Sequence, residues 1–101
     1  MNEYIFLMHN DTHPSAPAAV LNNWTPYIGS LQASGRFRGG SAIGPGFSAR
    51  KDGATLPLTT HIGGFIRVEA YSLDDALSLL IGNPVYESGG TVEIRELPRT
   101  D

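Results

Sequence analysis

The sequence predicts a single α+β domain in which strands and helices alternate and the strands form an antiparallel sheet. Residues 3–9 form a short apolar run of strand length, and residues 62–71 alternate apolar with polar side chains. The stretch between residues 15 and 35 instead carries apolar residues at helical spacing. A chain of 101 residues has the usual size of one domain, so we expect one domain over residues 1–101.

The first strand is expected over residues 3–9, with Tyr4, Phe6 and Met8 on one face. The helix that follows has apolar residues three or four positions apart, at Val20, Trp24, Ile28 and Leu31. Ser15 is the candidate N-cap of this helix, and Gly35 is its expected end. Pro26 lies inside the pattern and should kink or locally break the helix.

A second strand is expected over residues 36–43, where Gly39-Gly40 indicates a bulge. Residues 44–60 are rich in Gly, Ser, Pro and Thr and predict a loop, with part of a hairpin as the alternative. A loop of this length in so small a domain is typical of a functional or mobile segment.

The second half of the chain repeats the pattern. A strand over residues 62–71 leads into a helix that Ser72 caps, and a last strand is expected over residues 91–97. Gly82 and Pro84 should end that helix. Its expected apolar stripe comprises Leu73, Ala76, Leu77 and Leu80. The order is β-α-β-β-α-β, the ferredoxin-like arrangement, with both helices on one face of the sheet.

The other face of the sheet would carry a mixture of aromatic and charged side chains. They are Phe65, Arg67, Glu69, Tyr71, Glu93 and Arg95. Such a face suits either water or a second subunit that encloses a partly polar cleft. We favour the second reading and expect a homodimer.

Composition excludes several function classes. The formal net charge is −3 and the basic residues are scattered, which argues against a nucleic-acid partner. No apolar stretch has the length of a membrane span, and the first residues lack the features of a signal peptide. With no Cys there is no disulfide framework, and a cytoplasmic location is the default expectation.

Several segments together resemble the YCII-related proteins, and most closely the subgroup marked by an Asp-Gly-Pro-Phe motif. The segments are Tyr4-Ile5-Phe6-Leu7-Met8-His9, the spacing of Trp24, Tyr27, Leu31 and Gly35, Gly63-Gly64-Phe65-Ile66, Glu69, Ser72-Leu73-Asp74-Asp75-Ala76, Asn83-Pro84 and Val92-Glu93-Ile94-Arg95. Asp52-Gly53 stands at the position of the signature, but Ala54-Thr55 replaces its Pro-Phe. The resemblance covers most of the chain.

The resemblance implies a dimeric α/β-barrel of two ferredoxin-like subunits, with a cleft between sheet and helices in each. Related proteins include a dehydrochlorinase that acts on a chlorinated aromatic, and a His–Asp pair is proposed as the active centre of some. The His that this pair usually places on the first helix has no counterpart, because residues 18–34 contain no His.

The leading catalytic candidate is His9, paired with Asp52 or Asp11. An imidazole titrates near neutrality, and a carboxylate fixes its tautomer and raises its basicity, as general acid–base catalysis requires. His9 ends a central strand, where side chains typically reach a cleft. The alternative is that His9 only bonds to the turn that follows.

The His9-x-Asp11-x-His13 spacing places three metal-ligand types on one side of an extended segment, and His61 could add a fourth. A polar turn before Pro14 explains the same residues, and we expect neither a metal site nor an organic cofactor.

Aromatic and basic residues could bind a small ligand. Trp24 and Tyr27 are either core contacts or a wall for an aromatic ligand. Arg36 and Arg67, with Arg38 beside them, could bind an anionic group if they converge in the cleft, and His61 is a further candidate for ligand binding. Cross-strand pairing with acidic residues is the alternative for the arginines.

Two functions from different classes follow. The first is a small-molecule enzyme that uses His9, oriented by Asp52 or Asp11, for an elimination or isomerisation without an organic cofactor. The second is a non-catalytic dimeric domain that binds a ligand or serves as an accessory to another protein. Plain structural dimerisation is a third reading and needs no cleft.

Overall fold

The computed structural model of the chain describes residues 1–54 and 56–99. Its elements are β1 (Asn2–His9), α1 (Ala18–Leu21), α2 (Trp24–Ala33), β2 (Phe37–Ala42), β3 (Ile62–Ala70), α3 (Leu73–Ser78), α4 (Pro84–Glu87) and β4 (Val92–Leu97). The strands form one antiparallel sheet in the order β2-β3-β1-β4. The α+β class and the β-α-β-β-α-β order are therefore confirmed, with two short helices in each helical segment.

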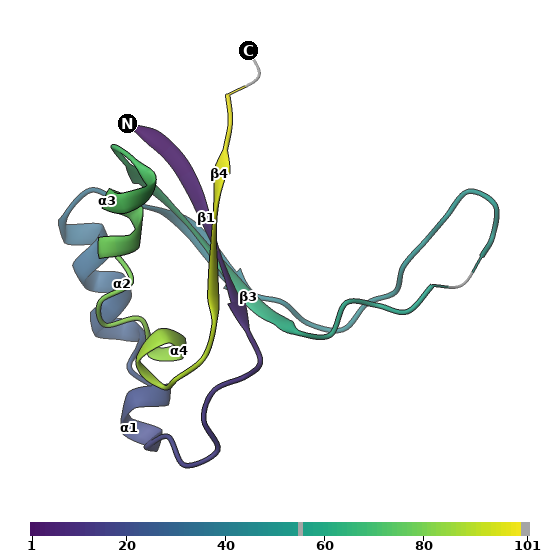
Figure 1. Cartoon of the computed structure of the whole chain (residues 1–101), viewed down its shortest axis with the longest axis horizontal. Coiled ribbons are helices and arrows are strands. Elements are labelled where there is room, and N and C mark those ends of the chain that lie inside the picture. Colours follow the sequence, from purple (N-terminus) through teal and green to yellow (C-terminus); the bar gives the residue numbers. More distant parts are fainter. Residues whose placement is uncertain (55, 100–101) are drawn as a thin grey trace.

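The helices lie on one side of the sheet and leave the other side uncovered (Figure 1). Side chains of β1 and β3 alternate between the two faces, and the buried set points toward the helices. Phe6 lies at the centre of this layer, opposite Ile66 of β3 and Ile94 of β4, and is fully buried. From the helices, Tyr27, Leu31, Ala76 and Leu80 complete the core.

The first helical segment breaks where Pro26 requires it. A proline cannot donate a hydrogen bond to the carbonyl four residues earlier, and its ring clashes with that carbonyl. For Pro26 this carbonyl belongs to Asn22, the C-cap of α1. Pro26 then occupies the first turn of α2, where the backbone N–H has no partner within the helix. The break is confirmed, but the predicted N-cap is wrong, because Pro17 and not Ser15 precedes α1.

Gly35 follows α2 with a φ of 74°, a left-handed conformation that ends helices, as expected. The bulge predicted at Gly39-Gly40 is also present, because the register between β2 and β3 shifts between Phe37 and Gly40. A Cβ atom on Gly40 would lie 2.5 Å from the carbonyl oxygen of Phe65, so only glycine fits there. The two strands can approach each other because that side chain is missing.

The second helical segment differs from its prediction in two respects. Ser72 caps α3 as expected, accepting a hydrogen bond from the Asp75 N–H at 3.1 Å. However, the helix ends at Ser78, and Pro84 starts a further short helix instead of only ending the first. Asn83, fully buried, caps this helix through its side-chain oxygen. The N-caps Ser72 and Asn83 thus start two separate helices, α3 and α4.

The apolar stripe predicted for this segment is only half buried. Ala76 and Leu80 lie in the core, whereas Leu73 and Leu77 are 55% and 52% exposed. A helix as short as α3 packs on the sheet along one narrow line, and the neighbouring positions of the stripe project past it. Leu73 and Leu77 therefore remain available to solvent.

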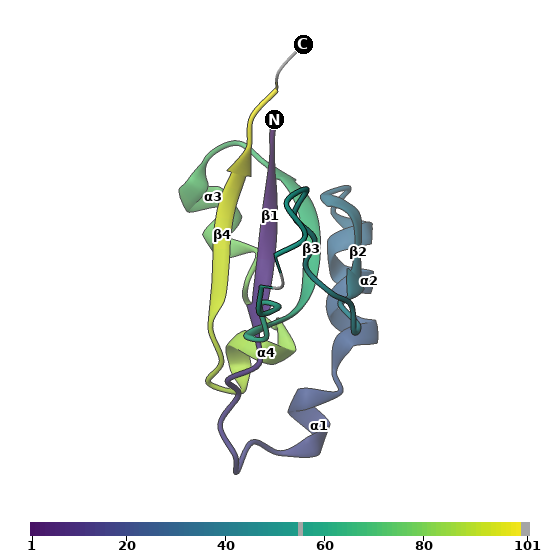
Figure 2. The ribbon, with the colours of Figure 1, turned by 90° about the vertical axis from the view of Figure 1, so that its right-hand side faces the viewer.

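Between β2 and β3 the chain leaves the sheet as a long arm and returns to it (Figure 1). In residues 44–54 and 56–61 there is no helix or strand, as the composition predicted. Several apolar side chains of the arm are exposed, and Phe47 is the most exposed of them at 86%. Figure 2, turned by 90°, shows the arm in front of the uncovered side of the sheet. No helix in the described part of the chain is long and apolar enough to cross a membrane.

Candidate active site

His9 and Glu93 form a hydrogen-bonded pair where β1 ends. Antiparallel pairing sets Leu7 opposite Glu93, so Glu93 projects from the uncovered face of the sheet. The register shifts between Met8 and His9, and the Nε2 atom of His9 lies 2.7 Å from Oε2 of Glu93. The side chain of His9 is 19% exposed and that of Glu93 is 36% exposed. This hydrogen bond holds the pKa of Glu93 below its usual value.

A second imidazole belongs to the same cluster. The rings of His9 and His61 meet edge to face, with centroids 5.1 Å apart and an interplanar angle of 72°. The Asn10 N–H donates to the carbonyl of His61 at 2.8 Å, which fixes the backbone of His61 beside the end of β1. His9, His61 and Glu93 each bring one nitrogen or oxygen atom to within 4.8 Å of the others.

His9 also lines a cavity of about 440 Å³ between the sheet and the helices. The walls are mostly apolar and come from Met8 of β1, Trp24 and Ile28 of α2, and Val85 of α4. A cavity of this size is in the range that small-molecule sites occupy. His9 is therefore both a lining residue of this cavity and the hydrogen-bond partner of Glu93.

Glycines of the sheet make room for this cavity. Gly64 pairs with Met8 and Gly40 pairs with Ile66, so both glycines occupy positions on the helix-covered face. Neither position has a side chain to fill the space below α2, and both glycines line the cavity. The Gly-rich composition that weakens these strands is therefore what opens the cleft.

A second, more open hollow of about 580 Å³ lies where the arm leaves the sheet. It is lined by Leu7 and Ile62 of the strands and by Ile43, Phe47 and Leu58 of the arm. Leu7 points to the uncovered face, whereas the cavity under α2 has walls from the helices, and Asn10 at the end of β1 lines both.

Asp11 has a structural partner in place of His9. Its carboxylate accepts hydrogen bonds from the backbone N–H of Thr91 at 2.8 Å and from the Thr91 hydroxyl at 2.6 Å. The two bonds lower the pKa of Asp11, and the nearby His9 adds a smaller effect in the same direction. His13 bonds to the hydroxyl of Ser15 at 2.7 Å. The alternating His9, Asp11 and His13 positions therefore serve three different contacts.

Asp52 lies in the arm and bonds within it. Its carboxylate accepts the Ala54 N–H at 2.9 Å and lies 3.3 Å from the guanidinium of Arg50. Thr55, the other residue that departs from the Asp-Gly-Pro-Phe signature, lies outside the described residues. The carboxylate that the structure brings to His9 is that of Glu93.

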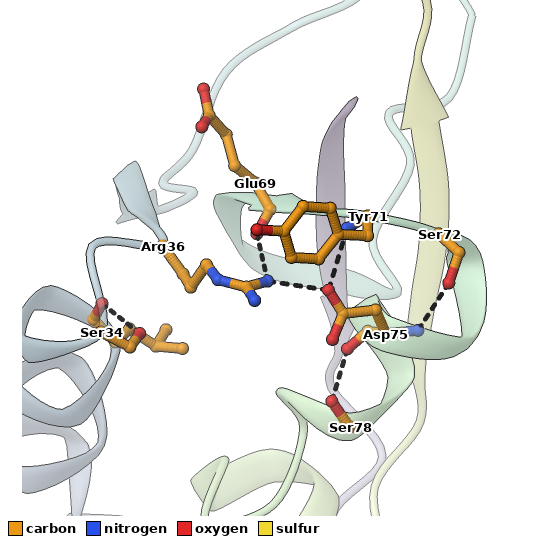
Figure 3. Close-up of polar contacts among 8 residues, drawn as sticks. Ser34, Arg36, Glu69, Tyr71, Ser72, Asp75 and Ser78 are labelled. Atoms are coloured by element: carbon orange, nitrogen blue, oxygen red, sulfur yellow. Dashed lines mark hydrogen bonds and ion pairs between the residues drawn. The ribbon is translucent and has the colours of Figure 1, made fainter. Parts of the chain in front are cut away.

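The arginines bind other parts of the chain. Arg36 donates to Asp75 at 2.8 Å and to the Glu69 carbonyl at 3.1 Å, and lies over the ring of Tyr71 (Figure 3). The Tyr71 N–H and the Arg36 guanidinium together lower the pKa of Asp75. This network sits at the end of β3 that is remote from His9, since His9 pairs with Ile62 at its start.

Arg67 donates to the carbonyl of Arg38 at 2.5 Å and lies 3.9 Å from Glu3. Arg38 in turn donates to the Glu69 carboxylate at 2.9 Å. Arg38 and Arg67 therefore form cross-strand contacts, and neither they nor Arg36 are among the residues that line the cavity under α2.

The two aromatic candidates separate into different roles. Tyr27 is buried, and its hydroxyl donates to the carbonyl of Leu79 at 2.7 Å, which ties α2 to the end of α3. Burial raises the pKa of Tyr27 to about 12. Trp24 meets Tyr27 edge to face at 6.2 Å and also lines the cavity. Of the pair, only Trp24 is placed to contact a ligand there.

Glu93 is the residue of the candidate site that the sequence analysis did not pair with His9. The expected sheet already placed Glu93 on the uncovered face, but not beside His9. The signal was available in the predicted topology, because in a ferredoxin-like sheet the last strand pairs with the first. Aligning residues 91–97 antiparallel to residues 3–9 brings Glu93 close to the end of the first strand.

Comparisons with known proteins support the fold. No protein-family model and no curated protein matches the sequence. Among solved structures, the chain is similar to 5-chloro-2-hydroxyhydroquinone dehydrochlorinase from Burkholderia phenoliruptrix AC1100, in its complex with 2,5-dihydroxybenzoquinone. The TM-score is 0.53 at 18% sequence identity, and the match covers 95% of each chain. The likeness extends over nearly the whole fold.

Proposed function

We propose that the protein is a small-molecule enzyme of the YCII-related family, in which His9 transfers a proton to or from an aromatic ligand held under α2. One observation supports this most directly: His9 lines an apolar cavity and is also bonded to a carboxylate. Glu93 takes the orienting role that the sequence suggested for an aspartate. A carboxylate in this role fixes the tautomer and stabilises the imidazolium that forms.

In this proposal each ring nitrogen of His9 has its own role. When the Nε2–H of His9 donates to Glu93, the lone pair of the neutral ring is on Nδ1. Nδ1 then accepts the substrate proton, and the electron pair left on the substrate expels an anionic leaving group. In an isomerisation the pair instead shifts a double bond, and the imidazolium returns the proton to another atom of the substrate. The reaction is an elimination or an isomerisation, and it requires no oxidant or reductant.

The proposed ligand class is a small hydroxylated aromatic or quinone. The flat apolar walls given by Trp24 and Phe37 suit a single ring. The structurally similar dehydrochlorinase was solved with 2,5-dihydroxybenzoquinone, which makes this compound a rational first probe. Among the described residues, those that line the cavity include no Arg or Lys, so we expect recognition by stacking and by His9 more than by ion pairing.

We also propose that two copies associate through the uncovered face of the sheet. Ile5, Leu7 and Phe65 lie side by side on this face in adjacent strands, and each is only partly buried in the single chain. The arm adds the exposed Phe47, which lines one hollow together with Leu7. Light scattering at micromolar concentration tests this, and a monomer would contradict it.

The deciding experiment compares His9→Ala with His13→Ala in chloride release from 5-chloro-2-hydroxyhydroquinone and in binding of 2,5-dihydroxybenzoquinone. General acid–base catalysis contributes about 10²–10⁴-fold, so His9→Ala should lower turnover by this order while His13→Ala leaves it unchanged. Equal turnover in both variants would refute the role of His9. Binding of the quinone without turnover by the wild type would instead favour the non-catalytic ligand-binding domain.

A further inference from the structure

We propose that His9, His61 and Glu93 form a binding site for one divalent transition-metal ion. Two imidazoles and a carboxylate come together from three separated parts of the chain: the end of β1, the residue before β3, and the second residue of β4. Their candidate ligand atoms lie within 4.8 Å of one another. This inference goes beyond the proposed function, since it concerns an ion and needs no organic ligand.

The chemistry of the three side chains selects the class of ion. Imidazole nitrogen with carboxylate oxygen suits Zn²⁺, Fe²⁺, Ni²⁺ or Cu²⁺, whereas Ca²⁺ and Mg²⁺ prefer sites made of oxygen alone. Metal–ligand bonds of about 2.0–2.2 Å place the ligand atoms of a tetrahedral site roughly 3.4 Å apart. His9 and Glu93, at 2.7 Å, must separate slightly, and His61 must move inward. Side-chain rotations supply both changes.

The surroundings allow an ion to enter. His61 is exposed and the other two side chains are partly exposed, so the cluster opens to solvent. The backbone around it is fixed, because β1 pairs with β4 and the His61 carbonyl accepts the Asn10 N–H. Arg95 lies 3.9 Å from the Oε1 atom of Glu93, so we expect Glu93 to give the ion only Oε2. Three protein ligands leave a coordination position for water.

A bound ion and the proposed acid–base step compete for His9. The ion takes the Nε2 lone pair, which puts the ring proton on Nδ1, the nitrogen that would otherwise accept the substrate proton. Zn²⁺ is therefore expected to inhibit turnover while it occupies the site, and a chelator should restore it. The same ion should protect the fold against heat, because the three ligands come together only when the separated parts of the chain are folded.

The test is isothermal titration of the chelator-treated protein with ZnCl₂, with no organic ligand present. The variants are His61→Ala and Glu93→Gln, and the matched control is His13→Ala, which removes an exposed imidazole outside the cluster. We expect one ion per chain, at least about tenfold weaker binding in His61→Ala and Glu93→Gln, and no change in His13→Ala. The absorption of Co²⁺ in the same site should show a tetrahedral spectrum that His61→Ala loses.

Either of two results would overturn the proposal: no saturable uptake of Zn²⁺ by the wild type, or equal affinities in wild type and His61→Ala. Loss of binding in His13→Ala but not in His61→Ala would place the ion elsewhere and also refute it. His61 lies on the surface, and the hydrogen bond from Asn10 goes to its backbone carbonyl and not to its side chain. His61→Ala should therefore fold, which circular dichroism can verify. The titration uses no substrate, so its result does not depend on whether the protein is an enzyme.

Discussion

Trp24 offers a direct test of where an aromatic ligand binds. It is the only tryptophan in the chain and it lines the cavity under α2. A ring stacked on Trp24 should quench its fluorescence, so a titration of the wild type with 2,5-dihydroxybenzoquinone should yield a saturable decrease. The fluorescence reports on this cavity specifically, since no other tryptophan contributes.

Replacing Trp24 by Leu keeps an apolar wall but removes the aromatic face. An aromatic pair contributes about 0.5–1.5 kcal/mol beyond its buried area. At 1.4 kcal/mol for each factor of ten, the dissociation constant should rise about twofold to twelvefold. Equilibrium dialysis, with the coloured quinone measured by absorbance, determines this constant without using the tryptophan.

Phe47→Leu is the matched control, because Phe47 lines the other hollow, on the uncovered side of the sheet. We expect Phe47→Leu to bind the quinone as the wild type does. An unchanged constant in Trp24→Leu together with weaker binding in Phe47→Leu would place the ligand at the base of the arm. That result would refute the reasoning that puts His9 and the ligand around the cavity under α2.

Three further predictions concern the fold. Gly40→Ala should destabilise the chain in urea unfolding, because its Cβ would lie 2.5 Å from a backbone oxygen of the next strand. Gly29→Ala, in open space on α2, should instead stabilise it by about 1 kcal/mol, and the same sign for both would contradict this. Tyr27→Phe deprives the Leu79 carbonyl of its donor and should cost about 1–2 kcal/mol, again in urea; no loss would rule out that bond. The pKa of Asp75 is lowered in the folded chain, so its carboxylate stabilises the fold fully above the ordinary pKa of 3.8. This stabilisation disappears as the pH falls through the lower pKa of the folded state. Asp75→Asn should therefore reduce the fall of Tm at acid pH.

The sequence predicted the sheet well because its strands are set by patterns that the chain carries locally. The expected strands over residues 3–9 and 62–71 correspond to β1 and β3, respectively, with ends that agree to within one residue. The helices were predicted less well because their ends depend on single polar residues. Asn83 looks like part of a loop in the sequence, yet its side chain accepts two backbone hydrogen bonds and starts a helix.

The candidate site was only half predictable for a different reason. His9 could be identified from its place at the end of a buried strand. Its carboxylate partner could not be chosen by distance along the chain, which favoured Asp11, or by the signature, which favoured Asp52. Both carboxylates have other partners. Asp11 accepts two hydrogen bonds from Thr91, and Asp52 contacts Arg50 and accepts the Ala54 N–H. Only strand register distinguishes Glu93, which is 84 residues away along the chain.

Register also explains why the cavity and the bonded His9 lie at this end of the sheet. At the centre of β1 both neighbouring strands supply large side chains, and Phe6 is sealed between Ile66 and Ile94. Two positions further along, Gly64 replaces the large residue of β3 opposite Met8, and the space under α2 opens. The bulge immediately after Met8 changes the pairing of His9 from the regular ladder to Ile62. Along β1, the close-packed Phe6 is thus followed by the open cavity at Met8 and by the hydrogen-bonded His9. This sequence of environments depends on Gly64 and on the register shift after Met8.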